Sequence, residues 1–166
     1  MKSNIILIGM PGVGKSTVGV ILAKLIGYSF IDTDLIIQEK ENRLLKDIIS
    51  AEGIEGFLKI ENRINSELQA ENSVIATGGS VVYGDEAMKH LSEIGTVVYL
   101  KLDYRKLKYR LGNIKNRGVV IHKGQRLSDL YKERCPLYEK YADIVIDENN
   151  CGIEKTVSRI VENINL

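Results

Sequence analysis

The sequence carries almost no excess charge, because 23 lysine and arginine residues against 22 aspartate and glutamate residues leave a formal net charge of +1 at pH 7. It lacks the sustained basic surface that binds nucleic acid through counterion release, so no nucleic-acid partner is predicted. It also lacks any apolar run near the length of a membrane span, and its first residues hold too short an apolar stretch for a signal peptide. We expect a cytoplasmic protein with no membrane partner.

Cysteine and histidine are scarce, with two residues of each type. Cys135 and Cys151 form no Cys-x-x-Cys pair, and no histidine stands beside them at metal-ligand spacing. A zinc site is therefore not predicted. In a reducing compartment both cysteines are expected to be free thiols.

The residues that are present are typical of one globular α/β domain. The chain has 166 residues, which is too short for two well-formed domains. Short consecutive apolar runs predict buried strands at residues 4–8, 29–31, 73–77, 96–102 and 144–146. Apolar spacings of three and four predict helices between them, one beginning near Lys15 and capped by Gly27, and others over about 54–69 and 153–164. This alternation predicts a mostly parallel sheet covered on both faces, with ligands at the carboxyl ends of its strands.

A phosphate-binding loop follows the first predicted strand. The run Gly-Met-Pro-Gly-Val-Gly-Lys-Ser, residues 9–16, has two glycines separated by four residues and followed by lysine and serine. Backbone N–H groups of such a loop point at phosphate oxygens, and the following helix adds the positive end of its dipole. Lys15 is expected to neutralise the β- and γ-phosphates and Ser16 to offer a hydroxyl to Mg²⁺. The predicted nucleotide-binding residues of the loop are Gly12, Val13, Gly14, Lys15, Ser16 and Thr17.

The predicted nucleotide is ATP, bound with Mg²⁺. The chain contains neither the Asn-Lys-x-Asp sequence that reads guanine nor an Asp-x-x-Gly segment, so a GTPase switch is not expected. Two function classes remain: an enzyme that phosphorylates a small molecule, and a module that binds ATP for regulation.

Two acids follow the second predicted strand. Asp32 and Asp34 are two residues apart, so one carboxylate can face the metal while the other faces the acceptor. In phosphoryl transfer one carboxylate orients the attacking hydroxyl and takes its proton, and another holds metal-bound water. The alternative is that one of the two only caps the following helix.

Together these residues resemble the shikimate kinases. The segments Asp32-Thr33-Asp34, Phe57-x-x-x-Glu61, Thr77-Gly78-Gly79, Arg117 and Arg134-Cys135-Pro136-Leu137-Tyr138 occur in the order seen in that family, and the similarity covers nearly the whole chain. The resemblance implies a three-layer α/β/α P-loop kinase fold with a five-stranded parallel sheet in the order 2-3-1-4-5. It further implies one domain over residues 1–166, with acceptor-binding helices at about 34–69 and a lid at about 112–124. The implied activity is MgATP-dependent phosphorylation of the 3-hydroxyl of shikimate.

The resemblance also implies roles for single residues. Asp34 looks like the base that orients the acceptor hydroxyl, and Asp32 resembles the residue that holds Mg²⁺ through water. Arg117 matches the lid arginine that reaches the transferring phosphate, and with Lys15 and Asp34 it forms the predicted catalytic set. Arg110 resembles a residue beside the adenine, and the residues that match substrate contacts are Gly78, Gly79 and, at the substrate carboxylate, Arg134.

The chain departs from the family pattern at three positions. Leu58 stands where the family has the second arginine of the carboxylate clamp. Lys59 is adjacent, but one helical step turns it by about 100°, and it lacks the planar fork of arginine. Ser80 replaces the third glycine of the family, and Gly118 replaces the proline after the lid arginine.

The change at Leu58 leaves the acceptor open. Loss of one charged hydrogen bond to a carboxylate costs on the order of 1.5 to 3 kcal/mol, or about tenfold to a hundredfold in binding. We expect a monomer that phosphorylates a small hydroxylated acceptor, with shikimate the leading candidate. The alternatives are another hydroxy acid, a polyol or a nucleoside monophosphate, or an ATP-binding regulatory module without acceptor turnover.

Overall fold

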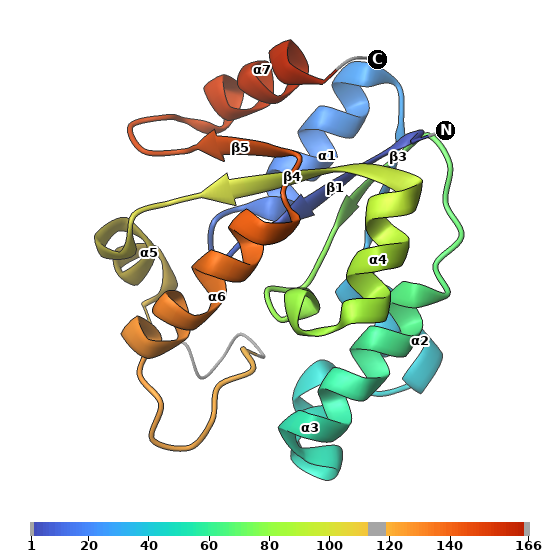
Figure 1. Cartoon of the computed structure of the whole chain (residues 1–166), viewed down its shortest axis with the longest axis vertical. Helices are drawn as coiled ribbons and strands as arrows, with labels where there is room; N and C mark the ends of the chain where they lie inside the picture. The colour runs from blue at the N-terminus through green and yellow to red at the C-terminus, as the bar shows by residue number, and fades with distance from the viewer. Residues whose placement is uncertain (1, 113–118, 165–166) are drawn as a thin grey trace.

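The computed structural model describes residues 2–112 and 119–164. Its centre is a five-stranded parallel sheet in the order β2-β3-β1-β4-β5 (Figure 1), which confirms the order inferred from the sequence. The strands are β1 (Asn4–Ile8), β2 (Ser29–Asp32), β3 (Ser73–Ala76), β4 (Gly95–Lys101) and β5 (Ile144–Asp147).

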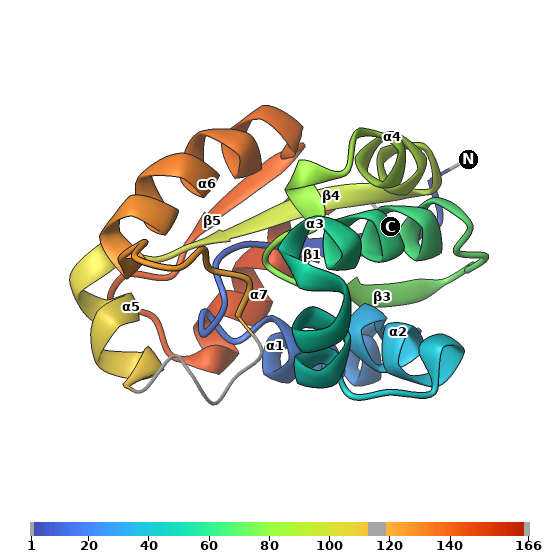
Figure 2. The same ribbon diagram turned by 90° about the horizontal axis from the view of Figure 1, so that it is seen from below.

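Helices cover both faces of this sheet. They are α1 (Lys15–Ile26), α2 (Thr33–Glu41), α3 (Leu45–Ser66), a 3-10 turn η1 (Val81–Tyr83), α4 (Asp85–Ile94), α5 (Tyr104–Leu111), α6 (Leu127–Tyr141) and α7 (Ile153–Asn163). Figure 2 shows α4 and α6 above the sheet and α1 and α7 below it. The three-layer α/β/α architecture is thereby confirmed.

The central strand β1 is buried along its whole length, which explains its run of consecutive apolar residues. Its one polar residue, Asn4, is fully bonded. The Asn4 amide donates to the carbonyl oxygens of Ala70 (2.7 Å) and Ile94 (3.0 Å), and its oxygen accepts from the backbone N–H of Ser73 (3.0 Å). These bonds fix the amino-terminal edge of the sheet, opposite the edge that carries the site.

Glycines in the left-handed region begin and end α1. Gly14 is the N-cap with φ 96°, and Gly27 is the C-cap with φ 74° and donates its N–H to the carbonyl of Ala23. The predicted start near Lys15 and the predicted cap at Gly27 are both confirmed.

A glycine also divides α3. Gly53 has φ 71° and ψ 177°, so the helix is broken there into a short first part and a longer second part. The sequence predicted a helix over about 54–69, which corresponds to the second part, whereas that part ends at Ser66. The second part buries Phe57, Glu61 and Ile64 against the core, as its spacing predicted.

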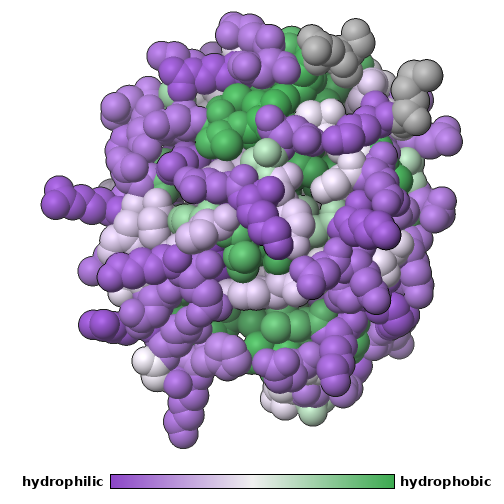
Figure 3. All heavy atoms as spheres, in the orientation of Figure 1, coloured by the Kyte–Doolittle hydropathy of each residue, from purple (hydrophilic) through white to green (hydrophobic). Residues whose placement is uncertain are grey.

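Hydrophilic side chains cover most of the face drawn in Figure 3, with apolar residues exposed in patches between them. No helix among the described residues combines the length and the hydropathy that a bilayer crossing requires. The expected lid at about 112–124 falls partly on residues 113–118, and these, with Arg117 and Gly118, lie outside the described residues.

Candidate active site

The loop between β1 and α1 has the backbone that phosphate binding needs. Gly9 and Gly12 have φ angles of 147° and 87°, which side-chain-bearing residues rarely adopt. A Cβ at Gly9 would also lie 2.7 Å from the carbonyl oxygen of Leu100, so only glycine fits beside β4. The N-cap Gly14 has no side chain to bond the first N–H groups of α1, and these remain directed out of the helix end.

Lys15 lies inside this loop. Its side chain is buried, and its ammonium group donates to the carbonyl oxygens of Gly9 (2.7 Å) and Met10 (3.0 Å). Burial lowers the pKa of Lys15 to about 8, while the nearby Asp34 acts in the opposite direction. The lysine is therefore held at the centre of the loop, where it can reach an anion.

Asp32, at the end of β2, uses its two carboxylate oxygens for different tasks. Oδ1 accepts from the backbone N–H of Asp34 (3.0 Å) and caps α2, so the alternative of a capping role is realised. Oδ2 accepts from the hydroxyl of Ser16 (2.8 Å). One side chain thus ties the start of α2 to the start of α1, and both predicted metal ligands lie together.

Asp34 is partly buried on the other side of the same turn. Burial, followed by the charge of Asp32, raises the pKa of Asp34 to about 6, and Lys15 opposes this rise. The carboxylate is still ionised at pH 7 and can accept a proton or a hydrogen bond.

The glycine turn after β3 brings the predicted residues together. A Cβ at Gly78 would lie 2.9 Å from Oδ1 of Asp34, and a Cβ at Gly79 would lie 2.7 Å from Cδ of Pro11 and 3.1 Å from Nη1 of Arg134. The backbone of this turn therefore contacts the phosphate loop, the predicted base and the predicted substrate arginine at once. A small cavity of about 50 Å³ lies at this meeting point, lined by Asp34, Gly78, Gly79 and Arg134 among others.

Arg134 is fully buried on α6, with 1% of its surface exposed. Its Nη2 donates to the carbonyl oxygen of Val120 (2.7 Å), and its Nε donates to the hydroxyl of Tyr83 (3.3 Å). Its guanidinium also lies over the ring of Tyr83, 5.3 Å from the centroid. Within the described residues, no carboxylate lies within 4.0 Å of this guanidinium.

A buried acid lies behind the glycine turn. Oε2 of Glu61 accepts a 2.6 Å hydrogen bond from the hydroxyl of Ser80, while Oε1 has no partner among the described residues. Burial raises the pKa of Glu61 to about 7; the Ser80 hydrogen bond lowers it and the charge of Asp34 raises it. Ser80, a departure from the family pattern, therefore supplies this acid with its hydrogen-bond donor.

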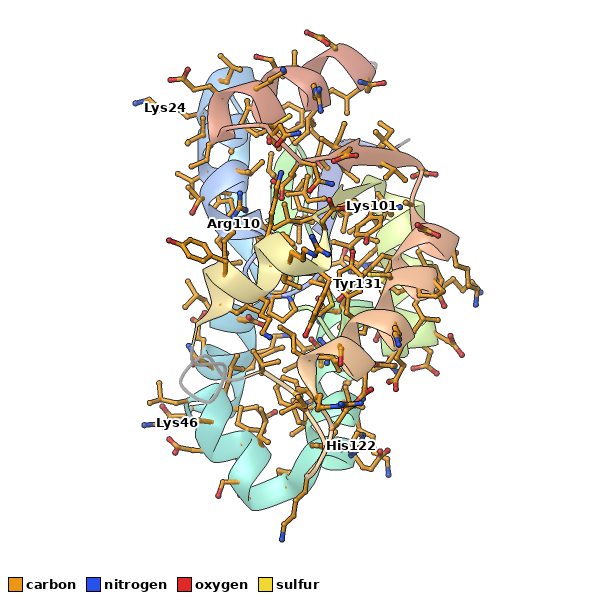
Figure 4. The ribbon with its side chains drawn as sticks, turned by 90° about the vertical axis from the view of Figure 1, so that its left-hand side faces the viewer. Lys24, Lys46, Lys101, Arg110, His122 and Tyr131 are labelled. Carbon is orange, nitrogen blue, oxygen red and sulfur yellow. The ribbon has the colours of Figure 1, made fainter. Side chains whose placement is uncertain are left out.

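A second cavity, of about 160 Å³, lies on the other side of the phosphate loop, beside Gly14 and Thr17. Arg110 extends from α5 toward the loop end of α1 (Figure 4), and its Nη1 donates to the carbonyl oxygen of Val13 (3.2 Å). Glu148, just after β5, lines the same cavity.

The structure brings together most of the residues that the sequence singled out. The loop residues, Asp32, Asp34, the glycine turn, Arg134 and Arg110 all lie around the carboxyl edge of the sheet, whereas Arg117 lies outside the described residues. Two contributors were missed: Tyr83, which contacts Arg134, and Glu148. Glu148 follows a strand end on that edge, so the strand-end rule alone could have indicated it.

Comparison with known proteins agrees with this geometry. Residues 11–165 match the family model described as shikimate kinase. The chain is 38% identical to a shikimate kinase of Histophilus somni over 97% of this chain and 94% of that protein. It is 40% identical to one from Haemophilus influenzae over 97% of this chain and 92% of that protein.

Solved structures extend the agreement to three dimensions. A shikimate kinase from Acinetobacter baumannii in complex with shikimate superposes with a TM-score of 0.88 at 34% identity, over 96% of this chain and 91% of that one. A shikimate kinase from Aquifex aeolicus gives a TM-score of 0.81 at 30% identity, over 96% and 94% of the two chains. With identities of 30% to 40% along almost the full length, and with the phosphate loop, paired acids and buried arginine in one site, the chain belongs to the shikimate kinase family.

Proposed function

We propose that the protein transfers the terminal phosphoryl group of ATP to a ring hydroxyl of shikimate. The main support for a carboxylate-bearing acceptor is the burial of Arg134, whose guanidinium has no carboxylate within 4.0 Å among the described residues. A buried cation of this kind is costly unless an anion reaches it. An acceptor that carries a carboxylate beside its hydroxyl groups supplies that anion and places a hydroxyl near Asp34.

The donor side fits a nucleotide with its metal. The first-turn N–H groups of α1 and the ammonium of Lys15 suit the phosphate chain, and the paired oxygens of Ser16 and Asp32, 2.8 Å apart, suit Mg²⁺. When bound, Mg²⁺ neutralises phosphate charge. Arg110 flanks the base, and we assign Gly12, Val13, Gly14 and Thr17 to the phosphate contacts.

Asp34 acts on the acceptor. Its carboxylate, ionised at pH 7, accepts the hydrogen bond of the attacking hydroxyl and takes its proton as the oxygen bonds to the γ-phosphorus. The bond from that phosphorus to the β–γ bridging oxygen breaks, and ADP leaves. Lys15 neutralises charge on the transferring group, and Arg117 is proposed to do so from the lid.

Leu58 weakens one end of the acceptor site. It is half-buried and lines a cavity of about 340 Å³ that Arg134 also lines, whereas Lys59 is exposed. The family's second carboxylate donor therefore has no replacement from its own helix turn. We expect turnover of shikimate with a raised KM.

The test is ADP release from MgATP against a panel of shikimate, quinate, gluconate and nucleoside monophosphates. Saturable turnover with shikimate is expected, and saturable turnover with only another member of the panel would overturn the acceptor assignment. ATP binding without turnover of any acceptor would favour the regulatory alternative.

Arg134→Lys separates acceptor binding from chemistry. Lysine keeps the charge but loses the bidentate fork, so the KM for shikimate should rise about tenfold or more while the KM for ATP stays unchanged. Arg105→Lys is the matched control, because Arg105 is exposed on α5. An unchanged shikimate KM in Arg134→Lys contradicts the role of Arg134.

A further inference from the structure

The segment from Arg134 to Tyr138 ends in a tyrosine to which the proposed reaction gives no role. Tyr138 lies on α6, four residues after Arg134, so the two side chains extend from the same face of the helix. The side chain of Tyr138 is completely buried, with 0% of its surface exposed. A buried tyrosine needs an acceptor for its hydroxyl hydrogen, and the position of that acceptor indicates which part of the protein the residue holds.

The hydroxyl of Tyr138 donates to the carbonyl oxygen of Gly79, with 2.6 Å between the two oxygen atoms. This distance is at the short end of the range for hydrogen bonds between oxygen atoms. Burial raises the pKa of Tyr138, while the charge of Arg134 opposes this rise, so the hydroxyl keeps its proton and remains a donor. The bond therefore fixes the backbone of the glycine turn that lines the acceptor cavity.

The same hydroxyl also contacts the phosphate loop. It lies 3.7 Å from Sδ of Met10, which is buried. The next residue of the loop, Pro11, packs on the glycine turn, because a Cβ at Gly79 would lie 2.7 Å from its Cδ and 3.2 Å from its nitrogen. Helix α6, the glycine turn and the phosphate loop therefore meet at the hydroxyl of Tyr138.

The ring of Tyr138 is itself held by the central sheet. It packs on the buried ring of Tyr99 in β4, with the ring centroids 5.1 Å apart and the planes tilted by 31°. β4 pairs with β1, the strand that leads into the phosphate loop. Close packing against a buried ring leaves Tyr138 little freedom to move, so its hydroxyl has a fixed position relative to both loops.

We propose that Tyr138 is a positioning residue for phosphoryl transfer, which sets the separation between the acceptor hydroxyl and the transferring phosphate by joining the glycine turn to the phosphate loop. This inference rests on the proposed function, because it requires an acceptor beside the glycine turn and a nucleotide on the loop. Transfer depends on that separation, and a misplacement of about 1 Å can lower the rate about a hundredfold. Tyr138 acts through Gly79 and Met10, and not by contact with the reacting atoms.

Tyr138→Phe tests this role, because it removes the hydroxyl and keeps the ring. The assay is ADP release over ranges of ATP and shikimate concentration, at a temperature well below the unfolding midpoint of every variant. The kcat should fall about tenfold to a hundredfold, while the KM for ATP and the KM for shikimate each change less than about threefold. This division is expected because the hydroxyl aligns two bound substrates and adds no contact to either.

Tyr99→Phe is the matched control. It removes the hydroxyl of the neighbouring buried ring, which lies beside the thiol of Cys135, and so it reproduces the loss of a buried tyrosine hydroxyl. Its kcat and both KM values should match those of the wild type, and thermal unfolding measures the stability of the two variants. An equal fall of kcat in Tyr99→Phe and Tyr138→Phe would show a general loss of structure and would overturn the proposal.

Pro11→Ala tests the same junction from the side of the phosphate loop. It removes ring atoms that pack on Gly79, and it should also lower kcat by a larger factor than it raises either KM. This variant decides the question if Tyr138→Phe does not fold, since an unchanged kcat would then overturn the proposal.

The remaining outcomes separate this role from the function on which it rests. If the wild type phosphorylates no acceptor, the proposed function fails and the role of Tyr138 fails with it. If the wild type turns over shikimate and folded Tyr138→Phe keeps the wild-type kcat, only the role of Tyr138 is overturned. The same holds if the variant raises the KM for shikimate alone, because Tyr138 would then serve acceptor binding and not alignment.

Discussion

Leu58→Arg should strengthen the binding of shikimate. Leu58 is half-buried and shares the wall of the 340 Å³ cavity with Arg134, so an arginine there can direct a second guanidinium at the acceptor carboxylate. Glu55 and Glu133 line the same cavity and limit the repulsion between the two cations. One added charge-assisted hydrogen bond of about 1.5 to 3 kcal/mol predicts a KM for shikimate that is about tenfold to a hundredfold lower.

The assay is steady-state ADP release over a range of shikimate concentrations at saturating MgATP. The added contact holds the substrate equally before and during transfer, so kcat should stay near the wild-type value while KM falls. Leu58→Met, which changes shape but adds no charge, should leave both unchanged. A folded Leu58→Arg protein whose KM for shikimate stays level or rises would refute the reasoning, because the carboxylate would then be held in another way.

Other substitutions test the remaining contacts. Asp34→Asn should lower kcat by about 10²-fold to 10⁴-fold with little change in the KM for the acceptor. In the wild type, kcat should fall as the pH drops through about 6, because Asp34 takes up a proton there. A kcat that does not change with pH in this range contradicts the role of Asp34 as base. Tyr83→Phe removes the hydroxyl that accepts from Arg134 and donates to Glu133, so the shikimate KM should rise severalfold with the ATP KM unchanged, as initial rates would reveal. Ser80→Gly removes the donor to Glu61 and should lower the free energy of unfolding by about 1 to 3 kcal/mol in urea titrations. Because the pKa of Glu61 is raised in the folded state, the native protein binds more protons than the unfolded chain between about pH 4.5 and 7. The free energy of unfolding should therefore fall as the pH rises across that window. Glu61→Gln should reduce this pH dependence, as melting curves at several pH values would show.

The phosphate loop and the order of elements could be read from the sequence because both depend on local chemistry. The glycines of residues 9–14 are needed for backbone angles that other residues avoid, and the consecutive apolar strands reflect burial on both faces. Asp32 and Asp34 were located by their place after a strand.

The acceptor and base sites required tertiary structure. The burial of Arg134, its contact with Tyr83, and the bond from Ser80 to Glu61 join residues that lie 19 to 51 positions apart in the sequence. No local sequence pattern predicts these hydrogen-bonded pairs, because they form only when α3, η1 and α6 pack over the glycine turn.

The sequence alone thus determined a P-loop kinase scaffold with paired acids, since glycine conformation, strand burial and helix periodicity act over a few residues. Only the tertiary structure decided that, among the described residues, the guanidinium of Arg134 beside the acceptor cavity is buried with no carboxylate within 4.0 Å, and that Oε2 of Glu148 beside the donor cavity is buried without a hydrogen bond. Desolvation depends on every element packed around a side chain, and so it is settled by the fold as a whole.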